Sequence, residues 1–87
     1  MTDNTTLLFE DALQYLGEKG IRKYVTYMCQ DQRRGQAWFN ALHEVYPGQA
    51  NVLRGSLADP FFKDDKAAII EALRMLLLHT PQKLEGL

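Results

Sequence analysis

The sequence predicts an all-α protein, a compact bundle of four main helices plus a short turn helix, in one domain over residues 1–87. The stretch QRRGQAWFNALHEVYP places its apolar side chains on one arc and its polar ones on the other, as a half-buried helix does. Apolar residues recur every three or four positions elsewhere, and no segment alternates apolar and polar residues like a strand. Residues 1–4 and 80–87 are expected to be loose termini.

The first helix is expected to begin at Asn4 or Thr5, either of which can cap its free backbone N–H groups. It is predicted to run to Leu16 and to stop there, because Gly17 and Gly20 follow and glycine commonly ends a helix. Its acidic residues lie in the first turns, where the helix dipole favours negative charge.

A second, short helix is predicted over residues 21–29, where apolar side chains recur at three- and four-residue spacing. Cys29 falls on its apolar arc, and we expect a buried, inert thiol. The periodicity does not continue in phase into the next helix. We therefore expect a bend near residues 30 and 31, with Asp31 as the cap of the helix that follows.

The central helix is predicted from Gln32 to Pro47, because proline forces the residue before it out of the α-helical region. Gly35 lies in its first turn, where glycine weakens a helix, and we expect the reason to be a close approach of another backbone. The core is expected to form around the apolar arc of this helix, which holds Trp38, Phe39, Leu42 and Val45.

The segment GQANVLR is predicted to form the short turn helix, which begins after a proline and is closed by Gly55. Its two largest apolar residues, Val52 and Leu53, are expected to pack under the central helix. These two contacts would join the turn helix to the core.

Residues 56–63 are predicted to be a connecting loop in which Asp59 and Pro60 set a turn. Arg54 could reach across this loop and pin the turn with an ion pair to Asp59, which we expect to be structural. The loop also carries two consecutive phenylalanines, at least one of which should be buried, Phe61 and Phe62.

The last helix is predicted to begin at Asp64 or Asp65 and to end at Leu78, ahead of Pro81. Its apolar arc is wider than one packed face requires, and residues 75–78 are four consecutive apolar residues that cannot all face one core. This surplus indicates either an interface, in a homodimer or with another protein, or the closing of a small core.

Charge and motifs favour some functions over others. The formal net charge of −1 provides no basic excess, which disfavours nucleic-acid binding. No run approaches the roughly 18 apolar residues needed to span a bilayer, and no signal-peptide features are present, so we expect a cytoplasmic protein without membrane contact. With one cysteine and no metal-binding or catalytic motif, we expect no cofactor, no metal, no small-molecule substrate and no enzyme activity.

Two groups of surface residues are candidates for binding. The first would contact a protein partner and combines polar residues of the central helix with apolar residues further along the chain, namely Gln36, Asn40, His43, Phe62, Met75 and Leu78. The second is basic and would contact phosphates in a nucleic acid, and it comprises Arg22, Lys23, Arg33 and Arg34. For both groups, a plain solvated surface is the competing interpretation.

The stretch RRGQAWFNALHEVYPGQANVLRGSLADPFFKDD resembles a pattern in small proteins of phages, prophages and some bacteria. In that pattern an R-x-GQ-x-x-FN-x-L helix precedes P-x-x-A-x-x-[IL]-RG-[TS], a DPF turn and a last helix. The matching residues are Arg33, Gly35, Gln36, Phe39, Asn40, Leu42, Pro47, Ala50, Leu53, Arg54, Gly55, Ser56, Asp59, Pro60 and Phe61. The match covers about 30 residues and leaves out the first thirty. The resemblance implies a phage context and no particular activity.

Two functional hypotheses follow from the sequence. The first is a non-enzymatic protein-interaction module, in the phage context a factor that binds and modulates a host or defence protein. It is motivated by the absence of catalytic motifs, the near-neutral charge and the surplus apolar surface. The second is a small nucleic-acid-binding regulator that uses the basic residues.

Overall fold

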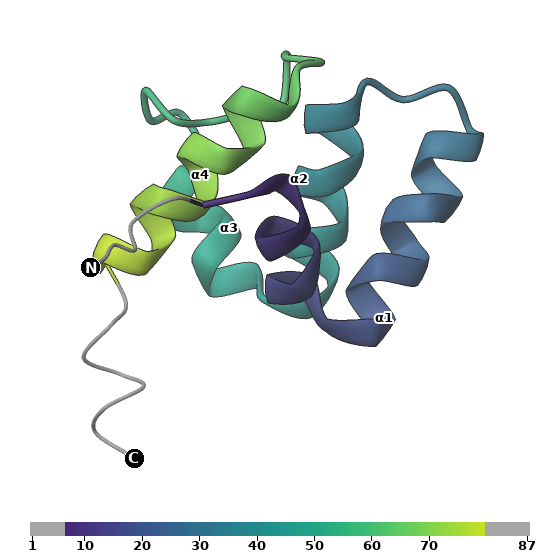
Figure 1. Ribbon diagram of the computed structural model, residues 1–87, viewed down its shortest axis with the longest axis horizontal. Coiled ribbons are helices and arrows are strands. Elements are labelled where there is room, and N and C mark those ends of the chain that lie inside the picture. The colour runs from purple at the N-terminus through teal and green to yellow at the C-terminus, as the bar shows by residue number, and fades with distance from the viewer. Residues whose placement is uncertain (1–6, 80–87) are drawn as a thin grey trace.

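The computed structural model describes residues 7–79 and confirms an all-α fold, with four helices and no strand in that range. Helix α2 (Arg34–Val45) contacts each of the other three, α1 (Phe9–Cys29), α3 (Pro47–Leu53) and α4 (Lys66–His79). Figure 1 shows α2 between the C-terminal part of α1 on one side and α3 and α4 on the other, with the first turns of α1 in front. The predicted loose termini and the cap residues Asn4 and Thr5 lie outside the described residues.

Helix α1 contains a sharp kink at Gly17, whose φ of 77° and ψ of 175° are not helical. Glycine adopts a positive φ at no steric cost, so it can join two helical arms that run in different directions. Figure 1 shows the two arms on either side of the kink. They correspond to the two helices predicted from the sequence, but the second arm starts directly after Gly17. Gly20, expected to stop the first helix, is buried inside the second arm.

The first arm begins later than expected, at Phe9, with Leu8 in an extended conformation. The carboxylate of Asp11 accepts a hydrogen bond from the backbone N–H of Leu8 at 2.8 Å. This side-chain contact satisfies one backbone donor at the helix start, which is half of a capping box.

The second arm of α1 ends in a Schellman motif in which Asp31 has a positive φ of 66°. The backbone N–H groups of Asp31 and Gln32 donate back to the carbonyls of Met28 and Tyr27, at 3.1 and 3.3 Å. Asp31 was expected to cap the next helix. Instead it closes the preceding one, and Arg33 is the residue before α2, without a side-chain cap.

Cys29 is exposed, contrary to the expectation of a buried thiol. Successive helical residues are rotated by about 100°, so Cys29 lies within about 40° of Val25 and about 20° of Arg22 around the helix axis. Both of these residues are exposed. The buried face of this arm instead follows Gly20 and Tyr24, and the apolar arc drawn from sequence was too wide.

The turns around α3 agree with the sequence. Tyr46 leaves the helical region before Pro47, and α3 starts at that proline. Gly55 follows α3 with a φ of 77°. Leu53 is buried under α2 as predicted, but Val52 is 37% exposed, because a seven-residue helix turns only one narrow face to the core.

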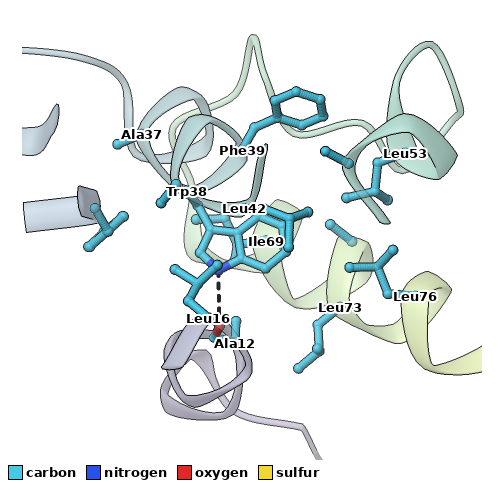
Figure 2. Close-up of a cluster of buried hydrophobic side chains, with 14 residues drawn as sticks. Ala12, Leu16, Ala37, Trp38, Phe39, Leu42, Leu53, Ile69, Leu73 and Leu76 are labelled. Carbon is cyan, nitrogen blue, oxygen red and sulfur yellow. Dashed lines mark hydrogen bonds between the residues drawn. The ribbon is translucent and has the colours of Figure 1, made fainter. Parts of the chain in front are cut away.

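The core is centred on Trp38, which is fully buried and whose indole Nε1–H donates to the carbonyl of Ala12 at 3.1 Å (Figure 2). Helices α1, α2, α3 and α4 all supply side chains to it, and Figure 2 labels Leu16, Leu42, Leu53, Ile69 and Leu73 among them. Trp38, Phe39 and Leu42 were predicted to be core residues and are buried, whereas Val45 packs at the edge.

Helix α4 uses most of its apolar surface for this core. Leu76 is fully buried, and Met75 and Leu77 are partly buried against the core. Only Leu78 of the four consecutive residues is largely exposed, at 75%. The surplus expected over residues 75–78 is therefore limited to one side chain, because α4 packs in a corner between α1, α2 and α3.

We expect Trp38→Ala to destabilise the protein by about 3–5 kcal/mol, because it removes the largest core side chain and its hydrogen bond to α1. A domain this small has little stability to spare. Circular dichroism during thermal unfolding measures the effect. Trp38→Phe loses the hydrogen bond but leaves a smaller aromatic ring in the core, and it should retain more stability than Trp38→Ala. Equal melting temperatures for Trp38→Ala and the wild type would place the core elsewhere.

We expect Asp31→Gly to raise the stability by about 1 kcal/mol, because glycine adopts the left-handed conformation without the steric cost of a side chain. For a domain of this size the melting temperature should rise by about 4–8 °C. Gln30→Gly is the matched control, since Gln30 is the preceding residue and has a φ of −94°. A similar gain in both variants would contradict the role given to the conformation of Asp31.

Candidate functional site

The loop between α3 and α4, residues 54–65, is docked against the first turn of α2. The backbone N–H of Gly35 donates to the carbonyl of Lys63 at 2.9 Å. A Cβ at Gly35 would overlap the carbonyl oxygens of Pro60 and Lys63, so only glycine permits this approach. The close backbone contact predicted from the sequence is confirmed, and its partner is this loop.

Arg34 adds a second attachment between the loop and α2. Its backbone N–H donates to Asp64 Oδ1 at 2.8 Å, and its guanidinium donates to the Asp64 carbonyl. Thus the loop satisfies two backbone donors that the start of any helix leaves free.

Arg34 also affects a side chain of α1. Burial raises the pKa of the Tyr24 hydroxyl above its usual range, and the Arg34 guanidinium beside it offsets part of that shift.

Asp59 organises the loop from within. Its two carboxylate oxygens accept the backbone N–H groups of Gly55 and Phe61, at 2.9 and 3.0 Å. The ion pair expected between Arg54 and Asp59 is not formed. The carboxylate is nearer to the donors of its own turn, and the Arg54 guanidinium lies over the ring of Phe39.

The docked loop places three aromatic rings next to one another. Phe39 of α2 and Phe61 of the loop meet edge to face with ring centroids 5.8 Å apart, and Phe61 meets Phe62 at 5.0 Å. We call Phe39, Phe61 and Phe62 the aromatic row. Exposure increases along it, from the buried Phe39 through the half-buried Phe61 to Phe62, which is 78% exposed. The sequence predicted that at least one of the two loop phenylalanines is buried, and neither is fully buried.

A groove of about 400 Å³ follows the aromatic row. Besides the three rings, it is lined by Asn40, His43, Arg54 and Asp59. A guanidinium lies at each end of the row, Arg54 at 5.6 Å from the Phe39 centroid and Arg33 at 5.8 Å from that of Phe62. Apolar grooves with a few polar groups at the rim are the usual form of binding sites.

The structure brings together three of the six residues predicted to contact a partner. Asn40, His43 and Phe62 line the groove, and Asn40 Nδ2 also donates to Gln32 Oε1 at 3.0 Å. Gln36 is half-buried on the same helix but is not part of the lining. Neither Met75 nor Leu78 lines the groove, and the Met75 sulfur accepts a hydrogen bond from Ser56.

The four basic residues proposed to bind nucleic acid differ in whether their charged groups already have a partner in the structure. Arg22 is paired with Glu18 one helical turn away, and Arg34 is bound to Asp64. Lys23 is half-buried on α1. Arg33 lies beside Phe62. Of these four side chains, Arg33 is the one that contacts the aromatic row, although it does not line the groove.

Sequence reasoning missed the groove itself, along with Phe39, Phe61, Arg54 and Asp59 as parts of one surface. Phe39 was placed in the core, and Arg54 and Asp59 were paired with each other. The available signal was the DPFF turn, which puts two large apolar residues directly after a strong turn former. It could not show that the turn docks beside α2.

Residues 7–79 contain no group of three or more His, Cys, Asp or Glu side chains arranged to hold a metal ion. None of the helices described is both long and apolar enough to cross a membrane. When the chain was compared with protein-family models, curated proteins and solved structures, none of them matched. The geometry of the groove is therefore the basis for the functional argument.

We expect Gly35→Ala to destabilise the protein by about 1–3 kcal/mol, because the added methyl group must push the loop away from α2. Gly48 is the matched control: it is also the second residue of a helix, and a Cβ there would meet nothing within 4 Å. Gly48→Ala should be neutral or stabilising. Urea denaturation measures both, and equal effects would mean that the contact between Gly35 and the loop does not hold the loop in place.

Proposed function

We propose that the chain is a non-enzymatic protein-interaction module that receives a segment of its partner in the groove along the aromatic row. The exposure of Phe62 supports this most directly. A phenylalanine that is 78% exposed loses the stabilisation that burial would bring. Here it is held by a loop whose backbone is fixed at Gly35 and by the ring of Phe61.

The composition of the groove fits a protein partner. Aromatic residues and arginine are enriched in the centres of protein interfaces, where they account for much of the binding energy. The groove contains the aromatic row and Arg54, and Arg33 lies next to it beside Phe62. The docked loop also keeps the rings ordered before binding, which lowers the entropy lost on association.

Nucleic-acid binding is the alternative, and the position of Arg33 beside an exposed ring is the observation in its favour. Bases stack on aromatic rings, and arginine attracts phosphate. Two of the four basic residues are already engaged by Glu18 and Asp64, and the chain carries a formal net charge of −1. The protein-interaction proposal accounts for more of the surface. Its phage setting, with a host or defence protein as partner, rests on the resemblance alone.

Photo-crosslinking in bacterial cells tests this function. A benzophenone amino acid in place of Phe62 should crosslink to a discrete protein band. Placed instead at Leu57, an even more exposed apolar residue of the same loop that does not line this groove, it should not give that band. A band at twice the mass of the chain would identify a homodimer. The same products from both positions, or crosslinks from Phe62 to nucleic acid only, would contradict the proposal.

A further inference from the structure

The aromatic row has a positive charge at each end. Following the contacts in order, the Arg54 guanidinium lies over Phe39, Phe39 meets Phe61, Phe61 meets Phe62, and Arg33 lies over Phe62. The two cations come from different elements, Arg33 from the residue before α2 and Arg54 from the residue after α3. Loop docking brings both to the aromatic row, where Arg54 lines the groove and Arg33 lies outside its lining, beside Phe62.

Both guanidiniums are free to bind a carboxylate. Among residues 7–79, the ion pairs are formed by Arg22 with Glu18 and by Arg74 with Glu71, so neither Arg33 nor Arg54 has an acidic partner there. No hydrogen bond from either guanidinium is formed within the described residues. A guanidinium carries five N–H donors in a planar fork that matches a bidentate carboxylate.

The one carboxylate in the groove does not neutralise these cations through a direct contact. Asp59 uses one oxygen for the backbone N–H of Gly55 and the other for that of Phe61. Each oxygen is thus directed into the loop. Arg54 in the groove and Arg33 beside Phe62 are therefore left with charges that a partner can complement.

We propose that the partner segment is acidic and apolar: a short peptide stretch with a large apolar or aromatic residue between carboxylates. This inference rests on the proposed function and specifies the chemistry of the partner. The central side chain packs edge to face on the aromatic row, as aromatic pairs prefer. The flanking Asp or Glu residues accept bidentate hydrogen bonds from Arg33 and Arg54.

The geometry also limits the length of the segment. The distance between the two guanidiniums cannot exceed the four contact distances along the row taken together, which are 5.6, 5.8, 5.0 and 5.8 Å. An extended chain rises by about 3.3 Å per residue, so about seven residues are enough to reach from one guanidinium to the other. Both carboxylates should therefore fall within one stretch of about seven residues.

Selection from a displayed library of random heptapeptides tests the inference. Peptides retained by the wild-type protein and lost with Phe62→Ala should be enriched in Asp and Glu around a large apolar residue. For a synthetic copy of a selected peptide, Arg33→Gln combined with Arg54→Gln should weaken binding by about tenfold or more. Arg22→Gln combined with Arg74→Gln removes the same charge elsewhere and should change binding less than about twofold.

Charge reversal provides a gain-of-function arm. Arg33→Glu combined with Arg54→Glu should select peptides rich in Lys and Arg in place of acidic ones. If the peptides whose binding requires Phe62 contain no acidic residues, this inference is overturned and the proposed function remains intact. Failure to select any peptide that depends on Phe62 would count against both. Binding of a twelve-nucleotide oligothymidylate that is lost on charge reversal would assign the arginines to phosphate and overturn the peptide inference.

Discussion

The contact between the first turn of α2 and the loop of residues 54–65 is the constraint on which the rest of the surface depends. The start of a helix leaves backbone donors without partners. Here the Lys63 carbonyl and the Asp64 carboxylate accept two of them, from Gly35 and Arg34. Because the donors lie on α2 and the acceptors on the loop, satisfying them fixes the position of the loop. The aromatic row and its two arginines follow from that position.

The core gives this arrangement a rigid base. Trp38 ties α2 to α1 through its indole hydrogen bond, while Leu53 and Leu73 bring α3 and α4 to the same cluster. The loop is thereby held at both ends by helices that share one core. Phe39 connects the two parts of the molecule, because it is buried in the core and also forms the inner end of the groove. A core substitution that displaces Phe39 should therefore also change the shape of the groove.

The fold could be predicted from local patterns, since each main break has a local cause. Gly17 separates the two arms of α1, and Pro47 and Gly55 bound the short helix. What could not be predicted depends on placement. Cys29 was assigned to a buried face because periodicity gives an arc without saying which part of it meets a neighbour. Asp31 is a common cap residue by type, but in the structure it has the left-handed conformation that closes the Schellman motif of α1.

The candidate site was predicted only in pieces. Gly35 indicated that some backbone comes close, but not which one. Asn40, His43 and Phe62 were named separately and meet in the groove, while Arg54 and Phe61 join them only through loop docking. In α4, the four consecutive apolar residues 75–78 left open whether they form an interface or close the core, and packing against three other helices covers all but Leu78 at least in part. Side chains brought together by long-range contacts leave little trace in local sequence periodicity.

Amide hydrogen exchange at two glycines tests the central claim most directly. Gly35 and Gly48 are each the second residue of a helix, where amides ordinarily exchange fast. If the loop is docked as described, the Gly35 amide, which donates to the Lys63 carbonyl, should exchange at least about tenfold more slowly than the Gly48 amide. Equal exchange rates for the two amides would show that the loop is not held against α2, and the groove would lose its structural basis.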